Sequence, residues 1–436
     1  MRHPNAMLRH HDRSAVADAP LGAADRIGTV DCAIVGGGIH GTYLSQRLLE
    51  DTTLDHDNIA IIDPNDRLLD SFRRKARACG MDSLRSTFVN HLGTDPFALQ
   101  GFAEGHDRED ELRPTVDYPD RPGLALLLDH ADHVIESKGL SALHRQTAVT
   151  AIHERTNGEL RLTTDDGVID TQTCVLAIGH GGRFQLPEWA EGVNRITHVW
   201  GEFDPNVDTD RTVIVGGGIT AAQLACKLTK TEQVTMVTRH PLQWELSEAD
   251  PPWLNWRHIE RELHCHPPGS AARLAVVEEA RYDATIPPYL YDPIKCRLDD
   301  GRLRILEGEV TAAMSVGNGI KLAFDDGLRL SADRVVCATG FKPVGDHPFV
   351  DHLADRLDLV RGARGFPVLG DETLAWRTVD GRSLPLYVSG ALAIGTVGPY
   401  GPNLAGARRA ADRIVPAVDD CVHRPTEMRE AMSTAD

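Results

Sequence analysis

Apolar and polar positions repeat in the same order at two places in the chain. An apolar run, "DCAIVG" at 31–36 or "TVIVG" at 212–216, is followed by glycines and a helical stretch. A second apolar run then follows, "IAIID" at 59–63 or "VTMVT" at 234–238. Short unbroken apolar runs are typical of parallel strands that are covered on both faces. Each copy therefore predicts a strand, a glycine-rich turn, a helix and a strand joined by a right-handed crossover.

The likeness between the two copies continues downstream. Residues 147–179 and 309–340 both alternate apolar and polar positions, contain an Asp-Asp-Gly turn, and close on an apolar run that ends in glycine. This pattern predicts a three-stranded meander followed by a strand that returns to the parallel sheet. We therefore expect an α/β fold with two Rossmann-like βαβ units, over 30–180 and 212–341, each carrying a meander.

Glycines of the first copy have the spacing of a dinucleotide-binding turn. Gly36 permits the tight turn, Gly38 lets a pyrophosphate approach the backbone, and Gly41 lets the helix pack against the strand. At the end of the second strand, the Asp63 carboxylate can accept hydrogen bonds from a ribose, which predicts FAD or NAD; a helix cap is the alternative. The complete predicted site is Gly36, Gly37, Gly38, His40, Gly41 and Asp63.

The second copy ends its second strand in a cation where the first has Asp63. A guanidinium at Arg239 pairs with a 2′-phosphate that a carboxylate would repel, so this site predicts NADPH. An exposed Arg239 that points to water is the alternative. The complete predicted site is Gly216, Gly218, Ile219, Thr220, Arg239 and His240, with Ala221 at the last small position of the turn.

Charge and composition limit the partners. The 436 residues carry a net charge of −18, and no stretch approaches eighteen unbroken apolar residues. An acidic chain repels nucleic acid and anionic membranes, so we expect neither as a partner and expect a cytoplasmic location. The acidic, lysine-poor composition is typical of proteins from a high-salt cytoplasm and of proteins from GC-rich genomes, and composition does not separate the two.

Sulfur and metal chemistry receive little support. The eight cysteines lack CxxC spacing, which predicts buried, reduced thiols and counts against a dithiol reductase. "HCHPPG" at 264–269 places metal-capable side chains in one short run, but adjacent residues seldom converge on one ion. We therefore predict no metal site.

With both turns and both meanders in place, the chain resembles the flavoproteins that have two dinucleotide-binding domains. "VCATGF" at 336–341 and "LYVSGALAIGTVGPYGPNLAGARRAADRIV" at 386–415 resemble their returning strand and closing FAD segment. Ala391 stands where the family usually has Asp. The resemblance implies further FAD contacts at Gly179, Gly340, Gly390, Asn403 and Leu404.

That resemblance also implies a domain organisation. An FAD-binding domain in two parts, 29–195 and 336–420, would carry an inserted NADPH-binding domain at 196–335. Residues 1–28 lack the apolar core of a signal peptide and are expected to form a mobile arm, and 421–436 a C-terminal tail.

Within that superfamily the chain is most similar to the lysine and ornithine N-hydroxylases. "GMDSLRSTFVNHLGTDPFALQGFA" at 80–103 resembles their flavin-facing segment, and "ITHVWGEF" at 196–203 resembles their linker, with His198 at the matching His. The resemblance implies hydroxylation of a small amine or amino acid by dioxygen through a peroxyflavin. Arg85 and Asn90 are the candidate catalytic residues; a surface salt bridge and a turn cap are their alternatives.

Two other functions stay open at this point. One is a flavin reductase or dehydrogenase that passes electrons to a quinone, a protein or a small disulfide. The other is a redox-sensing or scaffold protein that keeps the nucleotide-binding folds without turnover. The sequence leaves the substrate and any homo-oligomeric state undetermined.

Overall fold

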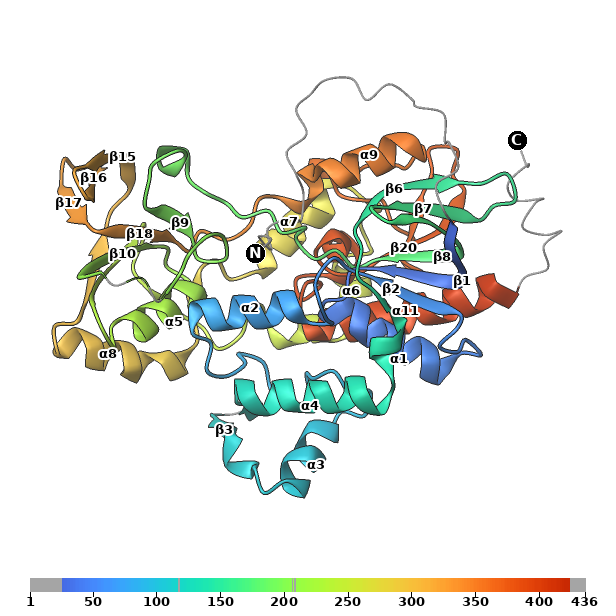
Figure 1. The fold of residues 1–436 in the computed structure, drawn as a ribbon, viewed down its shortest axis with the longest axis horizontal. Coiled ribbons are helices and arrows are strands. Elements are labelled where there is room, and N and C mark those ends of the chain that lie inside the picture. Colours follow the sequence, from blue (N-terminus) through green and yellow to red (C-terminus); the bar gives the residue numbers. More distant parts are fainter. Residues whose placement is uncertain (1–25, 117, 206, 208, 424–436) are drawn as a thin grey trace.

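The computed structural model describes residues 26–116, 118–205, 207 and 209–423. These ranges form two parallel-sheet units side by side, with a smaller lobe of helices and one hairpin beneath them (Figure 1). The predicted α/β fold class with two Rossmann-like units is confirmed.

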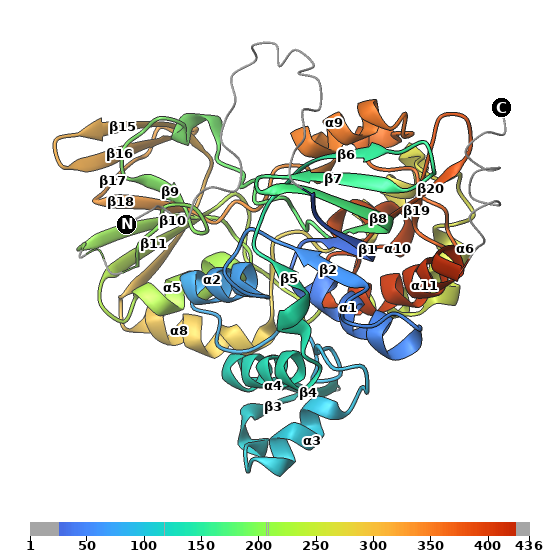
Figure 2. The ribbon, with the colours of Figure 1, turned by 45° about the vertical axis from the view of Figure 1, so that its right-hand side comes forward.

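The first sheet is built around strands with unbroken apolar runs. It has the order β19-β20-β8-β1-β2-β5, and all neighbours are parallel except β19 and β20. Both faces are covered, by α1 and α11 on one side and by β6, β7 and α9 on the other (Figure 2). The bounds are β1 (Arg26–Val35), β2 (Ile59–Ile62), β5 (His144–Arg145), β6 (Val149–Glu154), β7 (Leu160–Thr164), β8 (Gly167–Leu176), β19 (Ala375–Arg377), β20 (Ser383–Val388), α1 (Ile39–Asp51), α9 (Pro348–Arg356) and α11 (Leu404–His423).

The second sheet is wholly parallel, with the order β14-β11-β10-β18-β9. Helices α5 and α8 lie on one side of it and a separate antiparallel meander lies on the other (Figure 1). The bounds are β9 (Ile196–His198), β10 (Arg211–Val215), β11 (Gln233–Thr238), β14 (Leu303–Glu307), β18 (Arg334–Cys337), α5 (Ile219–Leu228), α8 (Tyr291–Asp299), and, in the meander, β15 (Val310–Val316), β16 (Gly319–Phe324) and β17 (Arg329–Ala332).

Helix α2 (Asp70–Cys79) runs between the two sheets and packs against α5 (Figure 1).

No helix in the described ranges is both long and apolar enough to cross a membrane. The remaining elements are the lobe of α3 (Ala98–Gly105), α4 (Leu124–Ser137), β3 (Leu112–Thr115) and β4 (Tyr118–Pro122), and the connecting α6 (Trp256–Glu262), α7 (Ala271–Ala280), α10 (Ile394–Val397), β12 (Gln243–Trp244) and β13 (Thr285–Ile286).

The meander of the first unit differs from the prediction. No separate strand returns to the sheet, because β8 pairs parallel with β1 from Val168 to Leu176. Its other edge pairs antiparallel with β7 over the first half and parallel with β20 over the second. Ten residues are enough for one strand to serve both roles. In the second unit the two roles are divided between β17 and β18, as predicted.

Domain boundaries also differ from the prediction. The boundary between 335 and 336 falls inside β18, whose four residues all pair with β10, so the whole strand belongs to the second sheet. Residues 26–28 open β1 rather than an arm, and 421–423 end α11 rather than begin a tail. The rest of the predicted arm and tail, 1–25 and 424–436, lies outside the described residues.

A buried ion pair joins the amino ends of three neighbouring strands of the second sheet. Nη2 of Arg334 lies 2.5 Å from Oε1 of Glu232, and the two side chains are 9% and 4% exposed. Nε of Arg334 donates to the Thr212 hydroxyl at 2.7 Å. Removing one partner would leave the other charge buried without compensation.

We therefore predict that Arg334→Met lowers the free energy of unfolding by roughly 3–5 kcal/mol, measured by urea denaturation. The control is Arg211→Met, because Arg211 pairs with Asp333 at 3.0 Å but is 59% exposed. The control should cost about 0–1 kcal/mol. Equal losses in the two variants would contradict the structural role of the buried pair.

Candidate functional site

The first glycine-rich turn, residues 36–41, packs too closely against its surroundings for side chains at two positions. Gly36 has φ of +114°, and a Cβ there would lie 2.4 Å from the Ala177 carbonyl oxygen. A Cβ on Gly41 would lie 1.8 Å from the Gly36 carbonyl oxygen. Glycine at these positions therefore brings the start of α1 against the carboxyl ends of β1 and β8.

Gly38 is different, because a Cβ there would meet nothing within 4 Å and its φ is −77°. The first turn of α1 has no side-chain cap, so its N–H groups remain available. Open space in front of uncapped N–H groups at a helix start fits the pyrophosphate of a dinucleotide.

Asp63 lies directly after β2 and closes the first turn. One carboxylate oxygen accepts from the Gly37 N–H at 2.7 Å, and the other accepts from the Asn65 N–H at 2.8 Å and from Asn65 Nδ2 at 2.6 Å. One partner lies in the turn and the other in the loop after β2, and neither starts a helix, which removes the helix-cap alternative. The carboxylate stands beside the turn, where a ribose of the bound nucleotide would reach it.

His40 connects the first turn to the closing segment of the chain. Its Nδ1 shares a hydrogen bond of 2.8 Å with the Ser389 hydroxyl, while its buried Nε2 makes no hydrogen bond. Burial lowers the pKa of His40 to about 4, so the ring is neutral at pH 7. A Cβ on Gly390 would lie 3.9 Å from this ring, and one on Gly401 would lie 3.6 Å from the Gly390 carbonyl oxygen.

The other predicted FAD contacts lie after strands of both sheets and at the start of α11. Gly179 and Gly340 follow β8 and β18 with φ of +58° and +80°, and a Cβ on either would meet nothing within 4 Å. Asn403 and Leu404 stand at the start of α11, where the Asn403 amide donates to the Glu248 carboxylate. FAD contacts at these four residues stay predictions.

The second turn, residues 216–221, repeats the geometry of the first. Gly216 has φ of +145°, and a Cβ there would lie 2.6 Å from the Ala338 carbonyl oxygen. Gly218, Ile219 and Thr220 line a cavity of about 340 Å³, which we call the shared cavity because Arg85 of the first unit also lines it.

Arg239 and His240 follow β11 beside the second turn. Arg239 is exposed and makes no hydrogen bond or ion pair with any described residue. The His240 ring lies 3.8 Å from the position of a Cβ on Gly217. A guanidinium without a protein partner is thus available near the second turn, as a 2′-phosphate would require.

The two candidate catalytic residues are not brought together. Arg85 donates to the carbonyl oxygens of residues 245, 246 and 247 at 2.8, 2.9 and 2.6 Å, and to the Thr285 hydroxyl at 2.9 Å. Its guanidinium therefore fastens the first unit to a loop of the second. Asn90 bonds Thr87 through its backbone N–H at 3.0 Å and its amide at 3.4 Å, and it does not line the shared cavity. Catalytic roles for both stay predictions.

A wall of aromatic rings beside the shared cavity was not predicted. His180 stacks on Phe341 with ring centroids 4.1 Å apart, Phe341 on Trp200 at 4.9 Å, and Phe184 on His198 at 4.8 Å. Burial lowers the pKa values of both His180 and His198 to about 4. His198 was singled out from the sequence only by resemblance, and no spacing in the chain signals that these rings meet.

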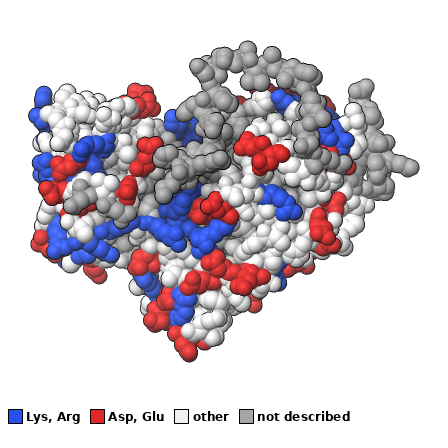
Figure 3. Space-filling view, viewed as in Figure 1, with Lys and Arg blue, Asp and Glu red and all other residues white. Residues whose placement is uncertain are grey.

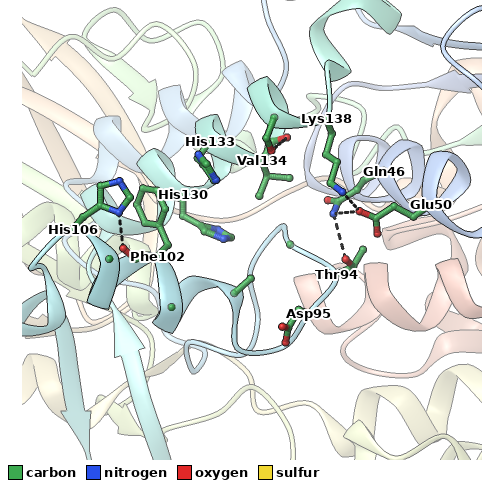
Figure 4. Close-up of a pocket in the computed structure, with 15 residues that line it drawn as sticks. Gln46, Glu50, Thr94, Asp95, Phe102, His106, His130, His133, Val134 and Lys138 are labelled. Carbon is green, nitrogen blue, oxygen red and sulfur yellow. Dashed lines mark hydrogen bonds and ion pairs between the residues drawn. The ribbon is translucent and has the colours of Figure 1, made fainter.

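A larger cavity of about 420 Å³ lies between α1, α3 and α4 (Figure 4). Lys138 pairs with Glu50 at 2.6 Å, and the Gln46 amide donates to Glu50 at 3.2 Å. The His106 Nδ1 shares a hydrogen bond of 2.7 Å with the Phe102 carbonyl oxygen. None of the predicted site residues lines this cavity.

Across the described part of the chain, no three His, Cys, Asp or Glu side chains are grouped as a metal site would require.

Two family models match segments of the chain that contain the glycine-rich turns. A model described as FAD-NAD(P)-binding matches residues 33–181, and one described as pyridine nucleotide-disulphide oxidoreductase matches residues 109–264. No relative among curated protein sequences matches the chain.

Solved structures share the whole arrangement. Ornithine N-hydroxylase from Kutzneria sp. 744 is 16% identical, with a TM-score of 0.73 over 90% of this chain and 99% of that one. L-lysine 6-monooxygenase from Pseudomonas syringae is 18% identical, with a TM-score of 0.68 over 90% and 100%. Bacillithiol disulfide reductase from Bacillus cereus is 15% identical, with a TM-score of 0.59 over 90% and 99%.

The chain has the fold of the two-dinucleotide-binding-domain flavoproteins. Within that flavoprotein fold, the residues of the first turn fit FAD: Gly38 leaves room for a pyrophosphate, Asp63 stands at the ribose position, and the Nε2 of His40 is buried without a hydrogen bond.

We predict that Gly38→Ala weakens flavin binding while the polypeptide still folds, because the new methyl group enters the open space in front of α1. The expected loss in FAD affinity is roughly tenfold or more, measured by titrating FAD into the flavin-free protein. The contrasting variant is Gly36→Ala, which should lower the free energy of unfolding by about 2–5 kcal/mol because its Cβ meets backbone at positive φ. Normal FAD binding by Gly38→Ala would show that the nucleotide does not approach this turn.

Proposed function

We propose that this protein is an FAD-containing, NADPH-dependent monooxygenase that hydroxylates a nitrogen of a small amine or amino acid. The observation that carries the proposal is the shared cavity, which touches the second turn at Gly218 and the predicted FAD contact Gly340 together. Such a cavity is the place where a nicotinamide and a flavin ring would meet. The fold shared with ornithine and lysine hydroxylating enzymes supports the same reaction.

In this proposal each turn holds one nucleotide. The N–H groups at the start of α1 bind the FAD pyrophosphate, and Asp63 accepts hydrogen bonds from its ribose. The N–H groups at Gly218–Thr220 bind the NADPH pyrophosphate, and Arg239 pairs with its 2′-phosphate. When bound, the flavin supplies hydride acceptance from NADPH and the reaction with dioxygen.

Residues of this chain keep the reaction site ordered. The start of α11 presents its partial positive charge toward the segment that contains Gly390. There it would stabilise negative charge on a bound, reduced flavin. His180 and His198 are neutral members of the aromatic wall, so they add packing and no charge. Nη1 of Arg281, which also lines the shared cavity, donates to the Pro399 carbonyl oxygen at 2.9 Å and ties the cavity to the closing segment.

A reductase remains the second candidate, because the same fold occurs in a bacillithiol disulfide reductase. None of the cysteines lines the shared cavity. Burial raises the pKa of the nearby Cys79 and Cys337 thiols to about 11 and about 12, so both are protonated at pH 7. The reductase candidate therefore predicts a quinone or a protein as the electron acceptor and not a disulfide. A cytoplasmic location and assembly into homo-oligomers stay predictions.

The first test reduces the flavin-loaded protein with NADPH without air and then admits dioxygen. We expect NADPH to reduce the flavin before dioxygen is admitted. After dioxygen is admitted, the oxidised flavin spectrum should return slowly, through a species whose spectrum differs from those of oxidised and reduced flavin. Immediate reoxidation would favour the reductase, and absence of reduction would reject the enzyme altogether.

The second test concerns the choice of nicotinamide nucleotide. Arg239→Ala should raise the KM for NADPH by roughly tenfold or more and leave the KM for NADH nearly unchanged, because only NADPH carries the phosphate that the guanidinium pairs with. Arg329→Ala, at an exposed position in β17, is the matched control and should change neither value. Equal increases for both nucleotides would remove the phosphate role of Arg239.

A further inference from the structure

Helix α2 connects the two nucleotide-binding turns. At its start, the Leu69 N–H donates to the Gly37 carbonyl oxygen at 2.8 Å. At its end, a Cβ on Gly80 would lie 2.8 Å from the Cβ of Lys227 on α5, the helix that follows the second turn. The middle of α2 therefore lies between the two units (Figure 1).

Lys75 occupies this middle position. Its carbonyl oxygen accepts from the Trp200 indole N–H at 3.3 Å, and its ammonium lies 5.3 Å from the centroid of the Phe341 ring. Trp200 and Phe341 both line the shared cavity, together with Gly218 of the second turn. The Lys75 ammonium is thus held next to the cavity from the side of the first unit.

The two cations that precede Lys75 on α2 have protein partners, but the Lys75 ammonium does not. Arg73 pairs with Asp132 at 2.5 Å and Arg74 with Asp70 at 3.2 Å. The ammonium of the half-buried Lys75 makes no hydrogen bond or ion pair with any residue of the described ranges, and its one recorded contact is the ring of Phe341. A partly desolvated cation without a counter-ion is unfavourable in the free protein and becomes favourable when an anion binds.

The surrounding surface is suited to an anion. Lys and Arg side chains gather over α2 and α8 on the face shown in Figure 3, although the whole chain carries a net charge of −18. A local basic surface beside a cavity raises the concentration of anions there. NADPH, with a pyrophosphate and a 2′-phosphate, is such an anion, and the second turn binds it from the opposite wall.

We propose that Lys75 binds a phosphate group of NADPH across the shared cavity, so that the nucleotide held by the second turn is also held by the first unit. This inference rests on the proposed function and adds a binding residue from the domain that holds the flavin. A nucleotide bound by both units fixes their relative position as well as its own.

Titration calorimetry of NADP⁺ into the flavin-loaded protein at pH 7 tests the proposal. Lys75→Met should weaken NADP⁺ binding by roughly tenfold, because a charge-assisted contact to phosphate is lost, while Lys75→Arg should keep most of the affinity. Lys321→Met, at an exposed position in β16, is the matched control and should bind as the parent does. Flavin content and thermal unfolding of each variant show that the fold is intact.

The pH dependence gives a second readout. Burial and the adjacent Arg74 lower the pKa of Lys75 to about 8, so the binding cation is lost as pH rises through this value. The titratable groups that face it from other elements are His180 and His198, whose pKa values of about 4 leave them neutral over this range. NADP⁺ affinity of the parent should therefore fall between pH 7 and 9, and that of Lys75→Met should stay flat.

Two failures are distinguishable. If the parent binds NADP⁺ and Lys75→Met binds it equally well with the same pH profile, the role of Lys75 is refuted and the proposed function stands. If the flavin-loaded parent does not bind NADP⁺, the proposed function falls and this inference falls with it.

Discussion

The fold depends on the contact between a glycine backbone and the carbonyl oxygen of a neighbouring strand. Gly36 lies against Ala177, and Gly216 lies against Ala338, at distances that leave no room for a Cβ. These contacts let each helix begin directly above the carboxyl ends of its strands, where its unpaired N–H groups face the cleft. The cavity, the nucleotides that we propose for it, and the chemistry between them all require this placement.

The second requirement is that the two units hold a fixed relation, because hydride transfer between two bound rings tolerates little displacement. Several contacts between distant segments provide it. The guanidinium of Arg85 is bound by carbonyl oxygens of 245–247, the Asn403 amide by Glu248, and α2 packs along α5. The Arg85 contacts use backbone oxygens, so on the loop side they depend on the path of the chain more than on its side chains.

Local patterns predicted the parts of the structure that local physics determines. The paired apolar runs, the glycine spacing of both turns and the start of α11 after Asn403 all follow from a few neighbouring residues, and the structure contains each of them. The aromatic wall was not predicted, because Phe184, Trp200 and Phe341 meet only after the chain has folded. The contacts of Arg85, a candidate catalytic residue, were also not predicted, because no spacing in the sequence reveals that the loop at 245–247 supplies oxygens to its guanidinium.

The unbroken strand β8 gives the two meanders different mechanical properties. In the first unit, one continuous strand, β8, belongs both to the meander and to the sheet beneath the first turn. Inserting a single residue into β8 would therefore shift its register and turn every following side chain to the opposite face. In the second unit, Asp333 interrupts the strand between β17 and β18, so its meander can change length or orientation without moving the residues under the second turn. Evolutionary variation in meander length is therefore expected to accumulate in the second unit and to be excluded from the first.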